Sequence, residues 1–176
     1  MQRHSNSGGE REFQVAKAEA SLKTNAVRLL DQAGIRYELR PYEADESDLS
    51  AETVADKIGR PREQVFKTLI TEGDRTGFLF ALVPAGMELD LRRLATASGN
   101  RRVAVVPLRD VQAVTGYLRG GVSPLAAKKP YPVFADETIQ LWDAVSISAG
   151  TRGLQILIAP EDLLRITAAT LADLAS

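Results

Sequence analysis

Residues 65–84 read VFKTLITEGDRTGFLFALVP, and this stretch decides the fold. Two apolar runs, 65–71 and 77–84, flank the polar segment EGDRT at 72–76. Two short apolar runs separated by a few turn-forming residues are typical of a β-hairpin. The sequence therefore predicts a hairpin here, and the elements on either side of it decide the fold class.

The segment before the hairpin predicts two helices and a strand. Helical spacing of apolar residues covers 22–33 and stops at Gly34, and apolar–polar alternation over 35–42 predicts a strand. An acidic loop is expected at residues 43–50, because residues 43–56 carry six acidic and no basic residues. Within it, Ser50 is expected to cap a short helix that ends at Gly59, and Pro61 suggests one further helical turn.

The segment after the hairpin alternates short helices and strands. Asp90 is expected to cap a helix over 91–98, and Gly99 ends it. We predict strands near 103–106, 131–134, 144–148 and 153–158, helices over 108–114 and 161–166, and a short element at 170–174. Without strict alternation of strand and helix, this order predicts an α+β fold with a curved mixed sheet.

The length of 176 residues and the hydrophobic content of 44% fit one domain with one sizeable core. We expect a polar, disordered leader at 1–20 and a single domain at 21–176. There is no apolar run of membrane-spanning length and no secretory signal in the leader, so we expect a cytoplasmic protein without a membrane partner.

The chain has no cysteine, and its one histidine is His4 in the polar leader. A cysteine nucleophile, thiolate metal sites, a histidine base and a histidine-ligated zinc are therefore excluded or improbable. No phosphate-binding glycine motif and no metal-type spacing of acidic residues occurs, so we expect no metal and no cofactor. Any catalysis must use lysine, carboxylates, hydroxyls, backbone amides or a group on the substrate.

Basic residues are concentrated in one segment although the net charge is only −1. Residues 90–130 carry eight basic and two acidic residues, while the rest of the chain carries 14 basic and 21 acidic residues. Such asymmetry suits a face that meets a polyanion such as nucleic acid. A solvated basic surface explains it equally well.

Residues 116–129, GYLRGGVSPLAAKK, combine a glycine pair, a proline and two lysines. Gly120 and Gly121 can take positive φ, and their N–H groups could then point together at an anion or an oxyanion. Pro124 biases Ser123 towards an extended conformation. From the residues alone, a tight turn is the favoured interpretation.

Lys67 is the first candidate for chemistry, because a lysine between apolar neighbours in a strand is unexpected. The more common explanation for such a lysine is that it lies on an edge strand, where its side chain reaches outward and blocks pairing with another strand. Tyr42 ends a strand beside the acidic loop, where its phenol could meet a ligand or line the rim of the core. Ser148 is expected to make structural hydrogen bonds.

Four stretches in the same order, KTNAVRLL, VFKTLI, TGYLRGGVSPLA and SAGTRGLQI, closely resemble the YbaK/EbsC family, relatives of the editing domain of bacterial prolyl-tRNA synthetases. The resemblance runs from about Lys23 to the C-terminus. It implies a compact mixed β-barrel-like sheet surrounded by helices. It also implies deacylation of mischarged aminoacyl-tRNA, with Cys-tRNA(Pro) as the best-known target and prolyl-tRNA synthetase as a possible partner.

The resemblance also implies site residues. It gives Lys67 and Gly120–Gly121 as catalytic residues, and Tyr42, Thr68, Ser123, Pro124 and Ser148 as substrate-binding residues. The stretch SAGTRGLQ departs from the family pattern, since Gln155 stands where some members have aspartate and Ala149 replaces glycine. Both departures could alter the preference for the amino acid.

The family's cysteine-specific branch is thought to let the thiol of the substrate attack the ester carbonyl. That chemistry suits a chain without cysteine or usable histidine, because the protein supplies shape and backbone hydrogen bonds. Lys67 would hold the terminal ribose or phosphate, or support developing negative charge. A deacylase for alanyl or other small aminoacyl-tRNA, and a non-catalytic tRNA-binding module, remain alternatives.

Overall fold

The computed structural model describes residues 22–176, so the predicted leader at 1–20 falls outside the described residues. Its helices are α2 (Asn25–Gln32), α3 (Ala51–Ile58), α4 (Leu91–Ser98), α5 (Val111–Thr115) and α6 (Pro160–Thr167). Short 3-10 turns are η1 (Arg62–Gln64), η2 (Leu108–Asp110) and η3 (Glu137–Leu141). The strands are β1 (Tyr37–Pro41), β2 (Phe66–Gly73), β3 (Gly77–Pro84), β4 (Val103–Val105), β5 (Val133–Asp136), β6 (Val145–Ser148), β7 (Leu154–Ile158) and β8 (Thr170–Ala172).

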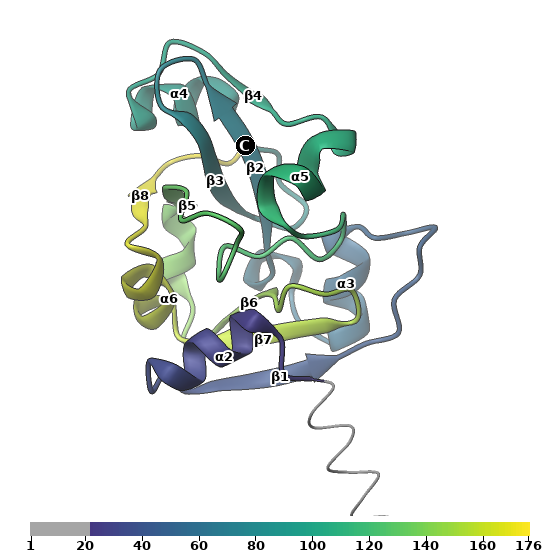
Figure 1. Ribbon diagram of the computed structural model, residues 1–176. Helices are drawn as coiled ribbons and strands as arrows, with labels where there is room; N and C mark the ends of the chain where they lie inside the picture. Colours follow the sequence, from purple (N-terminus) through teal and green to yellow (C-terminus); the bar gives the residue numbers. More distant parts are fainter. Residues whose placement is uncertain (1–21) are drawn as a thin grey trace, which may run out of the picture.

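The strands form two sheets (Figure 1). One is a five-stranded mixed sheet in the order β4-β2-β3-β5-β8, in which β2 pairs antiparallel with β3 and β4, while β5 pairs parallel with β3 and β8. The other is an antiparallel sheet in the order β1-β7-β6. A single bridge between Val65 and Ser146 joins them. The predicted α+β class with a mixed sheet is confirmed, and the strands are divided between two sheets.

Local signals set most of the helix ends. Ser50 and Asp90 cap α3 and α4 as predicted, and Gly59 and Gly99 end these helices with left-handed φ of 69° and 75°. Helix α2 begins later than the predicted 22–33, because the Oγ1 of Thr24 accepts the N–H of Val27 at 3.2 Å and makes Thr24 the cap. A side chain that satisfies a free N–H of the first turn fixes where a helix starts.

Two further elements differ from the sequence prediction. Strand β5 begins at Val133 instead of 131, since Pro132 offers only its carbonyl, which accepts the N–H of Phe80 at 2.8 Å. The 3-10 turn η3 was not predicted. It starts where the carboxylate of Asp136 accepts the N–H of Thr138 at 3.1 Å, a capping contact between residues two apart in the sequence.

The apolar core has two main clusters that share β3. Phe80 and Leu82 face the larger cluster, which includes α2 and the inner face of the three-stranded sheet. Leu79, Ala81 and Val83 face the smaller cluster under α4. These five residues are each at most 1% exposed, so β3 is the shared wall of both clusters.

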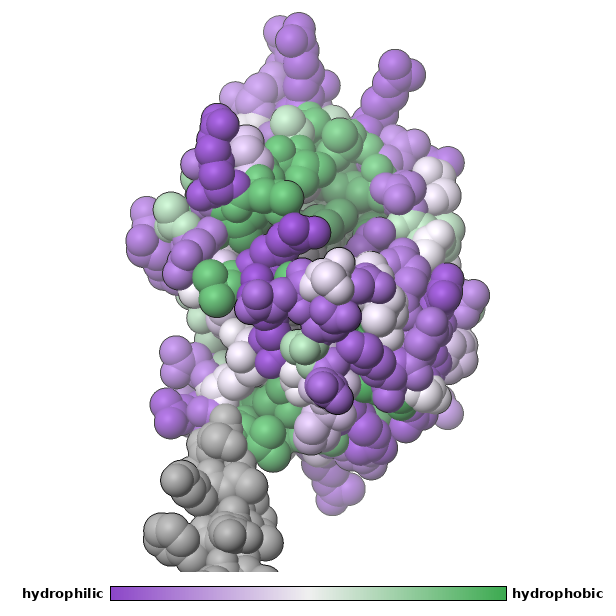
Figure 2. All heavy atoms as spheres, turned by 90° about the vertical axis from the view of Figure 1, so that its right-hand side faces the viewer, coloured by the Kyte–Doolittle hydropathy of each residue, from purple (hydrophilic) through white to green (hydrophobic). Residues whose placement is uncertain are grey.

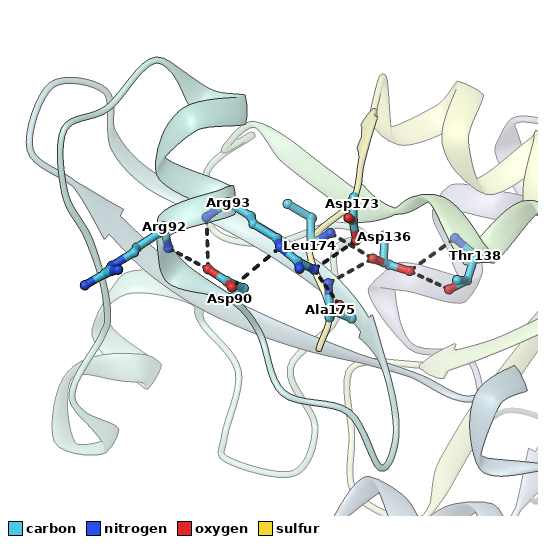
Figure 3. A network of polar contacts seen from close by, with 8 residues as sticks. All are labelled: Asp90, Arg92, Arg93, Asp136, Thr138, Asp173, Leu174 and Ala175. Carbon is cyan, nitrogen blue, oxygen red and sulfur yellow. Dashed lines mark hydrogen bonds and ion pairs between the residues drawn. The ribbon is translucent and has the colours of Figure 1, made fainter.

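The C-terminal segment is held by Asp136 (Figure 3). The Oδ1 of Asp136 accepts the N–H groups of Leu174 and Ala175 at 2.9 and 3.0 Å, and its Oδ2 accepts both the N–H and the hydroxyl of Thr138. Arg93 of α4 adds bonds to Asp173 and to the Ala175 carbonyl. The last residues therefore close the smaller cluster beside residues 88–90.

We expect Asp136→Ala to lower the free energy of unfolding by about 2–4 kcal/mol, because two buried backbone N–H groups lose a charged acceptor. Urea unfolding of both proteins measures this. Asp143→Ala, at an exposed position, is the matched control and should change stability little. An equally small effect of Asp136→Ala would contradict the assigned role of the carboxylate.

The contribution of Asp136 should also depend on pH. Burial by itself raises the pKa of Asp136, but the hydrogen bonds from Thr138, Leu174 and Ala175 outweigh it and lower the pKa below 3.8. A lowered pKa in the folded state gives stability that is complete above the unfolded pKa and is lost as pH falls through the folded value. The stability difference between wild type and Asp136→Asn should therefore shrink below about pH 4.

Candidate functional site

A cavity of about 440 Å³ lies along one edge of β2. Strand β4 pairs with β2 at Thr71–Gly73, and the Val65–Ser146 bridge brings β6 to the other end. Between these contacts, residues 66–69 have no strand partner on that edge within the described part of the chain, and the cavity fills the gap. Figure 2 shows a recess framed by hydrophobic side chains on this face of the molecule.

The cavity wall is apolar for the most part and polar at a few places. Apolar side chains come from α3, β2, the segment after β4 and the glycine segment: Val54, Val65, Phe66, Ile70, Val106, Val111 and Val122. Val105 and Leu108 also line it and are exposed. Its polar or charged residues are Ser50, Glu52, Lys67, Thr68, Glu88, Arg119, Ser148 and Gln155. A mainly apolar hollow with few polar groups is the usual form of a small-molecule site.

Lys67 is half-buried on the cavity wall. It takes part in none of the ion pairs or side-chain hydrogen bonds found among residues 22–176. Glu52 faces it from the first turn of α3, and Glu52 Oε1 accepts the Gly86 N–H at 2.8 Å. Its own backbone N–H, the Gly86 N–H, Lys67 and Arg62 lower the pKa of Glu52 in spite of burial. Glu52 is therefore anionic, and the Lys67 ammonium keeps its donors for a ligand.

The two glycines of the 116–129 segment have different conformations and different tasks. Gly120 lines the cavity with φ of +83°, and its N–H has no backbone partner in the described chain. Gly121 has no positive φ, and its N–H donates to the Leu118 carbonyl at 2.9 Å. The sequence suggested that both N–H groups could point at a ligand, and only the N–H of Gly120 is without a backbone partner in the described chain.

Close packing explains why both positions are glycine. A Cβ on Gly120 would lie 3.1 Å from the Leu49 side chain, and a Cβ on Gly121 would lie 3.1 Å from the backbone of Thr151. The ring of Tyr117 packs on Gly150 in the same way, since a Cβ there would be 2.8 Å from the ring. The glycine segment thus lies directly against the turn that follows β6.

Two side chains fasten this contact. Arg152 Nε donates to the Arg119 carbonyl at 2.7 Å, and its Nη1 reaches Glu46 at 3.4 Å. The hydroxyl of Tyr117 donates to the Leu125 carbonyl, and burial raises the pKa of Tyr117 to about 12. Tyr117 therefore stays a neutral donor and serves the structure of the loop.

Of the predicted site residues, Lys67, Thr68, Gly120 and Ser148 line the cavity. Ser123 and Pro124 are buried and do not line it, and Ser123 Oγ accepts the Leu125 N–H at 3.2 Å and holds the turn. Tyr42 does not line this cavity. It lines a separate hollow together with residues 43–46 and Lys57.

Three neutral polar residues form one part of the cavity wall. Ser148 is 9% exposed and its Oγ accepts the Gly150 N–H at 3.2 Å. Gln155 is 5% exposed, and its Oε1 accepts the Ser146 hydroxyl at 2.8 Å. Thr68 Oγ1 is buried and is the one buried side-chain polar atom without a partner in residues 22–176. An unpartnered buried hydroxyl is costly and calls for an explanation.

The described residues contain no group of three histidine, cysteine, aspartate or glutamate side chains placed to hold a metal ion. In the same part of the chain, no helix has the length and apolar character needed to cross a bilayer. A lysine with free donors, an available backbone N–H and neutral hydroxyls in one hollow suit a ligand that carries negative charge and groups able to form hydrogen bonds.

Residues 45–166 match the aminoacyl-tRNA editing domain family, and the chain belongs to this family. It is 42% identical to an Enterococcus faecalis protein named Cys-tRNA(Pro)/Cys-tRNA(Cys) deacylase EbsC, over 91% of this chain and 98% of that protein. It is 24% identical to the multifunctional Ser/Thr-tRNA deacylase ProXp-y of Escherichia coli K12, over 80% and 84% of the two chains. A crystal structure described as a trans-editing enzyme for prolyl tRNA synthetase is 26% identical, with a TM-score of 0.71 over 80% of this chain and 87% of that one.

Sequence reasoning did not find Glu52 and Glu88 as wall residues. In the sequence, Glu52 is an acidic residue in the first turn of a helix, a common position for such residues, and this position does not indicate a pocket. Glu88 reaches the wall because the C-terminal residue pairs with it, through Ser176 N–H to the Glu88 carbonyl at 2.9 Å and the reverse bond at 3.0 Å. Both positions depend on contacts between segments distant in sequence.

We expect Arg152→Ala to speed amide hydrogen exchange at Gly121 by about 10-fold or more, because the loop loses a charged donor that ties it down. Exchange followed by NMR or mass spectrometry measures this. Arg36→Ala, at an exposed position outside the loop, is the control. Unchanged exchange at Gly121 would show that the Arg152–Arg119 contact does not hold the segment.

We expect Thr68→Val to raise the free energy of unfolding by about 1–2 kcal/mol, since it removes a buried hydroxyl that has no partner. Thr71→Val is the matched control in the same strand. Its hydroxyl donates to the Leu79 carbonyl at 2.9 Å, so its loss should destabilise. Thermal unfolding compares the two variants, and equal destabilisation by both would contradict the unpartnered state of Thr68.

Proposed function

We propose that this protein is a trans-editing enzyme that hydrolyses the ester bond of mischarged aminoacyl-tRNA in the cytoplasm, with Cys-tRNA(Pro) as principal substrate. The observation that carries the proposal is that Lys67, Thr68, Gly120 and Ser148, from three separate stretches, line one cavity. The names of the Enterococcus and Escherichia relatives support the same activity. Residues 21–176 would act as one editing domain, with prolyl-tRNA synthetase as a possible source of the tRNA.

The cavity suits substrate-assisted chemistry. The cysteinyl thiol attacks the ester carbonyl carbon, a C–S bond forms, and the ester C–O bond breaks. The thiol proton passes to the departing ribose oxygen, so tRNA leaves and the cyclic thioester that remains is opened by water. A small hollow bends the aminoacyl group into attack geometry, and the Gly120 N–H donates to the oxygen that becomes negative.

Lys67 would bind the tRNA end instead of acting as a base. It makes no ion pair within residues 22–176, and the anionic Glu52 lines the same cavity. A charged lysine is a good partner for the terminal phosphate or ribose and for developing negative charge. Arg119 at the cavity and the exposed Val105 and Leu108 would meet the terminal nucleotide.

We expect Lys67→Ala to lower kcat/KM for Cys-tRNA(Pro) by about 100-fold or more, because the ester loses a charge-assisted contact. Release of amino acid from charged tRNA measures it. Lys57→Ala is the control, since that lysine lies outside the cavity. Wild-type protein that releases no cysteine from Cys-tRNA(Pro) would overturn the proposed function. Full activity of Lys67→Ala would remove only the role of Lys67.

A further inference from the structure

The wall of the cavity separates charged from neutral polar groups. Lys67 and Glu52 are half-buried, and Glu88 and Arg119 are exposed. Ser148 and Gln155, by contrast, are at most 9% exposed and come from the antiparallel sheet. The charged groups of the wall therefore all lie in its accessible part, and the polar groups of its enclosed part are neutral.

An aminoacyl ester has the same division. Its α-ammonium and the phosphates of the tRNA carry charge, while the side chain of a small amino acid is neutral. Charged groups stay where water or a counter-charge reaches them, because burying them unpaired is costly. The ester end thus belongs with Lys67 and Glu52, and the amino-acid side chain belongs beside Ser148 and Gln155.

The amide of Gln155 is oriented by a buried partner. Ser146 Oγ donates to Gln155 Oε1 at 2.8 Å, which leaves Nε2 as the end of the amide with no hydrogen bond in residues 22–176. Ser148 and Gln155 are directly opposite one another in the β6–β7 register, so their side chains share a face. The wall therefore presents an amide donor next to a hydroxyl, with the Thr68 hydroxyl unpartnered nearby.

On the basis of the proposed function, we infer that Gln155 is a specificity-determining residue that favours an aminoacyl side chain able to accept a hydrogen bond. Its Nε2–H donates to that acceptor, and Ser146 is a positioning residue that holds the amide. Such a site accepts a seryl group better than an alanyl group, because a bound alanyl group leaves the Gln155 Nε2–H without a partner. Serine and alanine differ only at Cβ, where serine carries a hydroxyl and alanine a hydrogen, and the site favours the hydroxyl.

Serine and alanine make a sharp comparison because neither carries a thiol. Any difference between them then reports recognition and is free of the substrate-assisted step. The probes are 3′-seryl-amido and 3′-alanyl-amido adenosine, which are not hydrolysed, tested as inhibitors of Cys-tRNA(Pro) deacylation. We expect the seryl probe to inhibit wild type on the order of 10-fold more strongly than the alanyl probe.

The variant Gln155→Met keeps the length of the side chain and removes the amide. Because it also strands the Ser146 hydroxyl, it is paired with Ser146→Ala, so that no new unpaired buried group remains. We expect the double variant to lose the seryl preference and to bind the alanyl probe as well as the seryl one. Gln140→Met, at an exposed position outside the cavity, is the control and should keep the wild-type ratio.

The possible outcomes separate this inference from the proposed function. Equal inhibition by the two probes in wild type, or an unchanged ratio in the double variant, overturns the role of Gln155 while Cys-tRNA(Pro) deacylation stands. Absence of Cys-tRNA(Pro) deacylation by wild type overturns the proposed function instead. Direct binding of the probes by calorimetry then still measures the ratio, and thermal unfolding verifies that each variant is folded.

Discussion

Strand β3 has its side chains buried on both faces, so each face needs its own layer of apolar partners. Its backbone likewise needs a neighbour on each side, and β2 and β5 fill these places. Strand β2 then lies one position from the edge of the sheet, covered along part of its length by the short β4. The cavity occupies the part of the β2 edge that β4 leaves uncovered, so its position follows from the burial of β3.

The elements that carry strong local signals could be predicted from the sequence. The hairpin, the caps Ser50 and Asp90 and the stops Gly59 and Gly99 all depend on contacts within a few residues. The start of strand β5 was predicted two residues too early, because Pro132 is bonded through its carbonyl to Phe80 of β3, and the hold of Asp136 on the C-terminal segment was not predicted. Non-local hydrogen bonds of this kind leave no periodic pattern.

The candidate site could be predicted in part. The family resemblance pointed to Lys67, Thr68, Gly120 and Ser148, which the fold brings to one cavity. It could not tell the two glycines apart, because the N–H of Gly121 donates to the Leu118 carbonyl while that of Gly120 has no backbone partner in the described chain, a difference that depends on the conformation of the loop. Nor could it give Gln155 an orientation, since that depends on the Ser146 hydroxyl from the neighbouring strand.

The uncovered edge of β2 has a consequence for how the protein meets other chains. An open strand edge is a template on which a strand from another molecule can add, which leads to aggregation. Natural sheets guard such edges with lysine, because its charge and long side chain oppose strand addition. Lys67 stands in the uncovered stretch, so the residue that would hold the tRNA end also keeps the entrance free of other polypeptide chains.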